Sequence, residues 1–250
     1  MIKANKLCKS YEEIEVLKDF DLEIKTGETL VILGQSGVGK SVFLKHVIGL
    51  ERPDSGTVEI DGVCISDLRG PQLYKAIRNT GMLFQGGALF DSLTILENTS
   101  FYFDQHSDLA LENVEERCIQ ALEMVGLKGT EYKMPSELSG GMKKRAALAR
   151  LIVYRPQILL YDEPTTGLDP IHASQIAELI YKIQKELQAT SVVVTHDIPT
   201  ALTVGDRLAM LHQGKIIFIG DKETFLRSED EMIRNFIEKA TPKGASANGK

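Results

Sequence analysis

The segment from Gly34 to Ser41 carries the strongest chemical signal in the sequence. Its letters, GQSGVGKS, match the phosphate-binding pattern GxxxxGK[ST] at every fixed position. Glycines let the backbone fold around a phosphate with its N–H groups pointing inward, and a helix that follows adds its positive end. We expect Lys40 to reach the β- and γ-phosphates of a nucleotide and Ser41 to bind Mg²⁺. The residues predicted to contact the nucleotide in this segment are Gly34, Gln35, Ser36, Gly37, Val38, Gly39, Lys40, Ser41 and Val42.

The flanks of this segment agree with a phosphate-binding loop. An apolar run at 29–33 precedes it, and an amphipathic run with Phe43, Leu44 and Val47 follows it. A glycine-rich turn that contains Lys-Ser by chance would not require these flanks. The loop predicts nucleotide binding only, because the same pattern also occurs in kinases and GTPases.

Two neighbouring acids, Asp162 and Glu163, follow an apolar run at 158–161. The end of a strand is where an α/β sheet presents ligand-binding groups. Because side chains alternate along a strand, we expect Asp162 to face Mg²⁺ and Glu163 to face the γ-phosphate, where it polarises the attacking water. The alternative interpretation is an ordinary acidic strand-to-loop junction. The phosphate loop earlier in the chain makes the catalytic interpretation considerably more specific.

Two kinds of strand are predicted to position these residues. Almost wholly apolar runs are typical of parallel strands covered on both faces, and they are expected at 29–33, 158–161 and 192–194. Alternating runs are typical of half-exposed antiparallel strands, and they are expected at 2–7, 20–24 and 57–60. Helical patterns separate the apolar runs, so the predicted fold class is α/β. A closing hairpin is predicted from 208–211 and 215–219.

The pattern becomes mostly helical between about residues 86 and 156. One helix is expected at 111–125, with Val114, Cys118, Leu122 and Val125 on one face. We interpret residues 86–156 as a helical subdomain inserted into one domain that covers residues 1–240. Residues 241–250 are rich in Gly, Ala, Ser and Lys, and we expect them to form a disordered tail.

The composition argues against several classes of protein. The formal net charge of −6 argues against non-specific binding to nucleic acid. The three cysteines form no CxxC pair, so the sequence predicts no zinc site and favours a reducing compartment. No run of about 18 apolar residues occurs, so we expect no membrane-spanning segment. A cytosolic protein that docks onto a membrane protein agrees with these features.

Further motifs make the chain similar to the ATP-binding cassette (ABC) ATPases. Residues 138–142, LSGGM, resemble the signature motif of that family and lie shortly before the acid pair. In addition, Tyr11 resembles the aromatic residue that stacks on adenine, and Gln85 the glutamine of the Q-loop. Residues 167–169 resemble the D-loop, and His196 the switch histidine. The resemblance covers most of the chain and implies a P-loop cassette with a mostly parallel core sheet, an N-terminal antiparallel β subdomain and an inserted helical subdomain.

The resemblance implies roles for single residues. It makes Glu163 and His196 catalytic. The residues that it implies for Mg²⁺ are Ser41, Gln85 and Asp162. It makes Tyr11 and Asp169 contacts to ATP, although an ordinary surface-turn residue is the alternative for Tyr11. Ser139, Gly140 and Gly141 would cap the ATP that the phosphate loop of a second copy holds, so that a head-to-tail homodimer closes two sites.

One position departs from the family pattern, because Met142 stands where many members have Gln. Met142 lies past the phosphate-facing residues, so we expect activity to be retained. A helix is predicted from about residue 142 to 153. Its four basic residues are expected to form a solvated face, and they are Lys143, Lys144, Arg145 and Arg150.

Three segments resemble one branch of the family, the Mla/Ttg2-like branch associated with phospholipid transport and organic-solvent resistance. They are residues 85–93, 135–142 and 165–171. The resemblance implies an ATP-hydrolysing motor subunit that moves phospholipids between the inner and outer membranes of bacteria. It also implies an integral membrane permease, an MCE-domain lipid-binding protein and in some cases a STAS-domain subunit as partners. The chain would then lie at the cytoplasmic face of the inner membrane, attached through the permease.

Other functions compete with this interpretation. The chain could serve another ABC importer, for amino acids or other small solutes. A soluble ABC protein that acts on nucleic acid or ribosomes usually has two cassettes or a long coiled-coil insert, and this sequence shows one cassette without that insert. A nucleotide-sensing subunit that only binds ATP would not need Glu163 and His196.

Overall fold

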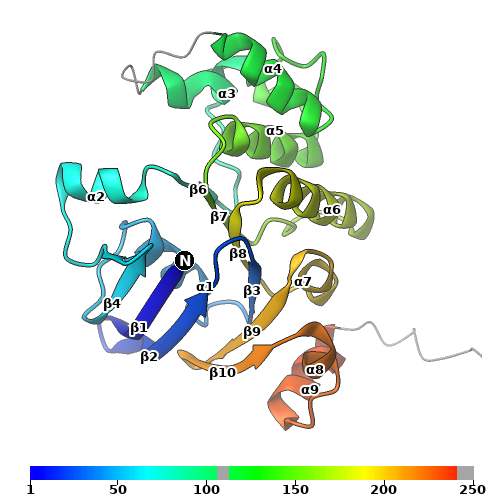
Figure 1. The fold of residues 1–250 in the computed structure, drawn as a ribbon. Coiled ribbons are helices and arrows are strands. Elements are labelled where there is room, and N and C mark those ends of the chain that lie inside the picture. Colours follow the sequence, from blue (N-terminus) through cyan, green and yellow to red (C-terminus); the bar gives the residue numbers. More distant parts are fainter. Residues whose placement is uncertain (106–112, 241–250) are drawn as a thin grey trace, which may run out of the picture. The chain divides into compact units, whose positions relative to one another are not determined.

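The computed structural model describes residues 1–105 and 113–240 (Figure 1). The chain divides into two compact units. The first combines Met1–Ile77 with the segment from Thr190 onward, and the second is Arg78–Ala189. The predicted tail, 241–250, lies outside the described residues.

The first unit contains an antiparallel sheet with the strand order β2-β1-β4-β5. Its strands are β1 (Ile2–Tyr11), β2 (Ile14–Ile24), β4 (Ser55–Ile60) and β5 (Val63–Cys64). Ile2 lies opposite Ile24 on one side and Ile60 on the other, and all three side chains are buried. The three predicted half-exposed strands are therefore confirmed, and β1 and β2 are several residues longer than expected.

The same unit contains the strand that leads into the phosphate loop, β3, and the strands that extend its sheet. They are β3 (Thr29–Leu33), β8 (Thr190–Thr195), β9 (Arg207–His212) and β10 (Lys215–Gly220). β3 pairs in parallel with β8 on one side and β9 on the other, and β10 is antiparallel to β9. Every residue of β3 and β8 is buried, as the apolar runs predicted. The predicted closing hairpin is confirmed.

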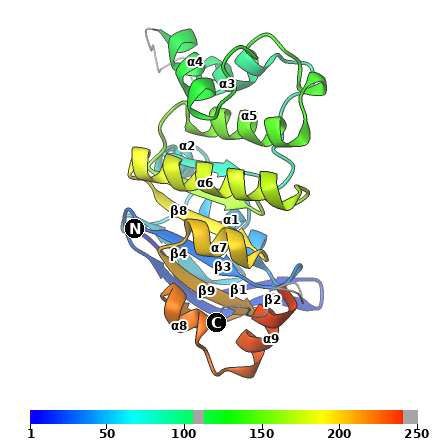
Figure 2. The same ribbon diagram turned by 90° about the vertical axis from the view of Figure 1, so that its right-hand side faces the viewer.

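Five helices belong to the described part of this unit. They are α1 (Lys40–Val47), α2 (Gly70–Ile77), α7 (Ile198–Val204), α8 (Lys222–Leu226) and α9 (Glu231–Ala240). Phe43 of α1 packs against Phe20 of β2, with ring centroids 4.9 Å apart. This contact joins the phosphate-loop helix to the antiparallel sheet. The short helix α8 packs against β9, β10 and α9 (Figure 2).

The second unit pairs β6 (Thr80–Leu83) in parallel with β7 (Ile158–Asp162). Its helices are α3 (Ile95–Asp104), α4 (Val114–Met124), η1 (Pro135–Glu137, a 3₁₀ turn), α5 (Gly140–Ile152) and α6 (Pro170–Leu187). Helices α3, α4 and α5 pack on one another (Figures 1 and 2). Together the two units confirm the predicted α/β class, with an antiparallel N-terminal sheet and mostly parallel core strands.

Two predicted helices differ from the observed ones at their ends. The helix expected at 111–125 is α4, which begins at Val114, and residues 111 and 112 lie outside the described residues. Cys118, Leu122 and Val125 are buried on its predicted apolar face. The helix expected from about residue 142 is α5, which already begins at Gly140 because Ser139 serves as its N-cap. Across residues 1–105 and 113–240, no helix is both long and apolar enough to cross a bilayer.

Candidate functional site

The phosphate loop connects β3 to α1, and two of its glycines are fixed by their surroundings. Gly39 has a φ of 106°, and a Cβ added there would lie 2.9 Å from Cγ1 of Val16. A Cβ at Gly34 would lie 2.6 Å from the carbonyl oxygen of Leu211. Any side chain at these positions would clash with β2 or β9. The loop is therefore held tightly at both of its ends.

Lys40 is the first residue of α1, and its side chain turns back into the loop. It is only 4% exposed, and its Nζ donates hydrogen bonds to the carbonyls of Gly34 at 2.7 Å and Gln35 at 3.0 Å. Ser41 follows in the first turn of the helix and is half-buried. The loop thus places an ammonium, a hydroxyl and a helix N-terminus together, which is the set of groups that binds phosphate.

The acid pair in the second unit differs from the prediction in one respect. Asp162 ends β7, and both Asp162 and Glu163 are 8% exposed. Glu163, however, has a φ of 46°, so it lies beyond the strand in the left-handed region. The expectation that strand alternation orients Glu163 is therefore wrong, because the backbone turns between the two acids. Its Oε2 accepts a hydrogen bond from the Thr166 hydroxyl at 3.1 Å.

Glu163 shares its left-handed backbone with other described residues, among them Lys6, Asp61 and Gln213. A non-glycine residue in this region costs about 1–3 kcal/mol. The conformation alone therefore does not mark Glu163 as catalytic, and its burial is the more specific observation.

The basic residues of α5 contradict the predicted solvated face. Lys144 is 8% exposed, and its Nζ donates to the main-chain carbonyl of Gln85. Arg145 donates to the Val125 carbonyl at 3.0 Å. Arg150 donates to the carbonyls of residues 87 and 88 at 2.9 and 2.7 Å. Lys143 is exposed, so one residue of the four behaves as expected.

The predicted signature residues lie at the N-terminus of α5. The Ser139 hydroxyl accepts a hydrogen bond from the Met142 N–H at 3.3 Å, which caps the helix. A Cβ added at Gly140 would meet open space. A Cβ at Gly141 would lie 3.4 Å from the ring of His172. The start of α5 therefore presents backbone N–H groups with little side-chain cover, which suits an anion.

Asp169 is the N-cap of α6, and it binds a residue that the sequence did not single out. Its Oδ1 accepts from the N–H groups of Ile171 and His172, at 3.1 and 3.2 Å. Its Oδ2 lies 2.5 Å from Nδ1 of His172. These hydrogen bonds, with the His172 ring first, lower the pKa of the Asp169 carboxyl. In the sequence, His172 could have been found from its position three residues after Asp169, an acid at the start of a helix.

The two remaining predicted residues lie in the first unit. His196 directly follows β8 and is exposed. Tyr11 ends β1 and is 38% exposed, and the Lys9 ammonium lies 5.3 Å from the centre of its ring. Partial burial and a hydrogen bond with Glu51 raise the pKa of Tyr11. The turn after Tyr11 leads to Val16, which contacts the phosphate loop, so the ring and the loop belong to one local structure.

The predicted magnesium ligands all offer oxygen. Ser41 lies in the first unit, and Gln85 and Asp162 lie in the second. A hydroxyl, an amide and a carboxylate are the hard donors that Mg²⁺ prefers, together with phosphate oxygens. The residues present therefore fit this ion.

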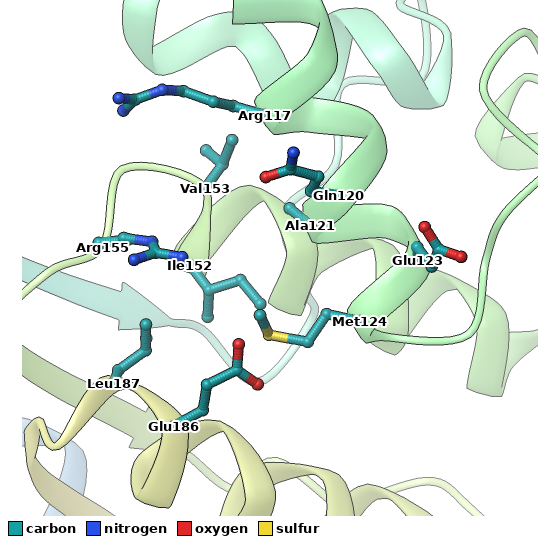
Figure 3. A pocket seen from close by; sticks show the side chains of 10 residues that line it. All are labelled: Arg117, Gln120, Ala121, Glu123, Met124, Ile152, Val153, Arg155, Glu186 and Leu187. Atoms are coloured by element: carbon teal, nitrogen blue, oxygen red, sulfur yellow. The ribbon is translucent and has the colours of Figure 1, made fainter.

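Two of the hollows in the described part of the second unit are sizeable. One of about 400 Å³ is mostly apolar, and its lining includes Phe84, the residue before Gln85. Its rings pack in pairs: Phe90 with Phe101 at 4.4 Å between centroids, and Tyr102 stacked on Tyr154 at 4.0 Å. The other, of about 520 Å³, lies among α4, the end of α5 and the end of α6 (Figure 3). None of the predicted site residues lines this second hollow.

Comparisons with known proteins agree with the fold and the loop. The family model described as ABC transporter matches residues 17–166. The chain is 42% identical to the probable ribonucleotide transport ATP-binding protein mkl of Mycobacterium tuberculosis over 94% of its length. It is 38% identical, over 89% of its length, to MlaF of Haemophilus influenzae, an intermembrane phospholipid transport ATP-binding protein, and covers 84% of that protein. It spans 66% of the length of mkl.

A solved structure is similar as well. The ATP-binding cassette MJ0796, in a dimeric post-hydrolysis state bound to ADP and Pi, matches with a TM-score of 0.79 and 35% identity. The match covers 88% of this chain and 98% of that one. This chain belongs to the ABC transporter family.

Proposed function

We propose that this chain binds and hydrolyses ATP as the motor subunit of a membrane transporter. The observation that carries the proposal is the phosphate loop, in which Lys40 is buried against the carbonyls of Gly34 and Gln35. The similarity to a cassette that was solved with ADP and Pi supports hydrolysis beyond binding. Residues 34–42 hold the phosphates, and Tyr11 stacks on adenine.

Catalysis in this proposal depends on carboxylates and a histidine. Glu163 polarises the attacking water, and His196 orients the γ-phosphate and supports Glu163. Ser41, Asp162 and Gln85 hold Mg²⁺, which neutralises charge on the phosphates when it is bound. The burial of Glu163 supports its role, because a carboxylate away from bulk water interacts more strongly with a nearby reactant.

We further propose that two copies form a homodimer around ATP. Ser139, Gly140 and Gly141 then cap the nucleotide that the other copy holds, and Asp169 contacts it as well. The open N-terminus of α5 supports this, because it offers an anion-binding end. The similar cassette MJ0796 was solved as a dimer. In each copy, residues 1–240 form one ATP-binding domain with residues 86–156 as its helical insert.

The apolar hollow whose lining includes Phe84 is proposed to receive a helix of an integral membrane permease. Its aromatic rings and its volume of about 400 Å³ suit the apolar side chains of one helix face. The permease would hold the chain at the cytoplasmic face of the inner membrane. An MCE-domain protein and a STAS-domain subunit are further proposed partners, and nucleic acid is not.

Phospholipids are the proposed substrate, moved between the inner and outer membranes. The similarity to MlaF, with 84% of that protein covered, supports this choice. The name of the similar protein mkl favours a second candidate, an importer of small solutes such as ribonucleotides. Purification of the whole transporter separates the two. Bound phospholipid and an MCE-domain protein support the first, and a soluble solute-binding protein supports the second.

Two variants test hydrolysis. Glu163→Gln is expected to bind ATP normally, to lose hydrolysis and to form a stable dimer with ATP, measured by phosphate release and light scattering. Hydrolysis at the normal rate would show that Glu163 is not catalytic. Lys40→Ala is expected to weaken nucleotide binding by roughly tenfold or more, because it removes charge-assisted hydrogen bonds. Unchanged affinity would refute the assignment of the loop.

A further inference from the structure

The apolar hollow of about 400 Å³ contains a cation that no part of the proposed mechanism uses. Among the described residues that line it, Arg150 is the one with a charged side chain. Arg150 lies in the last turn of α5 and is half-buried. Burial lowers the pKa of its guanidinium, which is the expected effect on a cation that has lost part of its hydration.

The guanidinium of Arg150 holds one wall of this hollow in place. It donates hydrogen bonds to the carbonyl of Ala88 at 2.7 Å and to that of Gly87 at 2.9 Å. Ala88 and Gly87 have φ values of 50° and 76°, so the backbone turns there and presents both carbonyls to the same side chain. The two bonds join this wall to a helix more than 60 residues further along the chain. Arg150 therefore fixes the backbone that carries Ala88 into the lining.

Arg150 also contacts the aromatic part of the lining. Its guanidinium carbon lies 5.6 Å from the centre of the Phe90 ring. The Phe90 ring in turn packs against Phe101, with centroids 4.4 Å apart. A cation over the face of an aromatic ring is attracted by the electrons of that face. One side chain thus connects the wall at 87–88 with the pair of rings.

These neighbours bind the guanidinium but leave its charge without a counter-charge. A guanidinium has five N–H donors, and the two carbonyls use two of them. Within residues 1–105 and 113–240, no carboxylate forms an ion pair with Arg150. A helix that fills the hollow removes water from this cation. Such a helix binds well only if it replaces the water with a suitable acceptor, and a carboxylate matches the guanidinium in both charge and shape.

We propose that Arg150 anchors the permease helix: it holds the wall of the hollow at residues 87 and 88 and binds a carboxylate that the helix carries. This inference rests on the proposed function, in which a permease helix occupies the hollow. The occupant is then an amphipathic helix with an apolar face for the rings and one Asp or Glu opposite Arg150. Complementary charge of this kind selects the correct partner and its register.

The test uses Arg150→Lys in the purified transporter, chain and permease together. This variant keeps a cation and places a primary amine in the hollow. A water-soluble carbodiimide activates carboxylates, and attack by an adjacent amine forms an amide without a spacer, so a link requires direct contact. We expect mass spectrometry to find position 150 joined to an Asp or Glu of the permease. Arg145→Lys is the matched control, because Arg145 lies on the same helix but donates to the Val125 carbonyl and does not line the hollow.

A permease that is present but forms no link at position 150 overturns the proposal, as does a link to an acid of this chain. If Arg150→Lys does not assemble with the permease, Ala88→Lys supplies the amine from the same wall and leaves Arg150 in place. The same two results then overturn the proposal.

Charge exchange separates recognition from a purely structural role of Arg150. Arg150→Glu should weaken the binding of the permease by roughly tenfold or more, because it removes a charge-assisted hydrogen bond. Replacing the linked acid of the permease by arginine should restore binding to the Arg150→Glu chain. A structural role would give the first result without the rescue, so failure of the rescue overturns the carboxylate contact.

Two further readouts complete the test. Hydrogen exchange of the amides at 87–90 should be faster in Arg150→Met than in Arg145→Met, and equal rates would overturn the role of Arg150 in holding the wall. A photoreactive benzoylphenylalanine in place of Phe84 reports the occupant of the hollow independently of Arg150. If it links to the permease and the amine variants do not, the role of Arg150 alone is refuted. If the chain binds no permease at all, the proposed function is refuted as well.

Discussion

Replacing Gly39 by alanine tests how the phosphate loop is held. The φ of 106° at Gly39 lies well outside the left-handed region near about +57° that other residues visit. The new methyl group would also lie 2.9 Å from Val16 Cγ1 and 3.0 Å from the Val16 carbonyl oxygen. The backbone conformation costs about 1–2 kcal/mol and the overpacking about 1–3 kcal/mol. We therefore expect Gly39→Ala to lower the free energy of unfolding by about 2–5 kcal/mol.

Gly37 offers a matched control in the same loop. Its φ of 82° is also positive, but a Cβ added there would meet no atom within 4 Å. Gly37→Ala should therefore show only the backbone cost, about 1–2 kcal/mol. The difference between the two variants measures the contact of Gly39 with β2. It should be about 1–3 kcal/mol, the range for overpacking.

Urea unfolding gives the two free energies, and a fluorescent ATP analogue gives the affinity of each variant. Gly39 is the N-cap of α1, so its displacement should move the N–H groups that face the phosphate. We expect Gly39→Ala to lose roughly tenfold or more in affinity, since a hydrogen bond to a charged group contributes on this scale. Equal stability of the two variants would refute the clash with Val16. Unchanged affinity of Gly39→Ala would refute the role of the helix start in binding.

Three further perturbations address other parts of the chain. His46 is 2% exposed and donates from Nδ1 to the Val42 carbonyl, and burial lowers its pKa. As the pH falls, the unfolded chain therefore takes up the proton first, so the free energy of unfolding measured with urea should decrease below about pH 6.5. This decrease should be smaller in His46→Gln. Ser139→Ala removes the cap of α5 and should cost about 1 kcal/mol in the same assay, whereas an unchanged value would contradict the cap. His172→Ala should raise the pKa of Asp169, followed by carboxyl NMR, because it removes the largest cause of the lowered value; a constant pKa would refute that hydrogen bond.

The apolar strands show which strand ends the hydrophobic pattern of the sequence predicts and which it misses. β3 has the predicted bounds because all five of its residues, Thr29–Leu33, are buried and four are aliphatic. β8 is longer at both ends than the apolar run at 192–194. Its added residues, which include Ser191 and Thr195, are polar but fully buried. Hydrophobicity cannot reveal a buried polar residue in a strand, because its burial depends on backbone pairing with a distant segment.

Elements that bury little were not predicted at all. Helix α2, Gly70–Ile77, has no buried residue. Strand β6, Thr80–Leu83, has four residues, of which two are buried. By contrast, α4 was predicted because Cys118, Leu122 and Val125 must all reach the core. Burial is not sufficient for prediction, because α6 (Pro170–Leu187) buries Ile176, Ile180 and Ile183 and was not singled out in the sequence.

The basic residues of α5 show a second limit of prediction from sequence, which concerns the atoms that accept their hydrogen bonds. Their charges appear in the sequence, but the atoms that accept from Lys144 and Arg150 are main-chain carbonyls at residues 85, 87 and 88. Every residue has such a carbonyl, so no letter marks the acceptor. The contact requires the donor and a backbone that presents the carbonyl, and Gly87 and Ala88 both have left-handed φ values, 76° and 50°. Motif matching therefore identifies Gln85 by its side chain but overlooks Lys144, although the Lys144 ammonium donates to the Gln85 carbonyl.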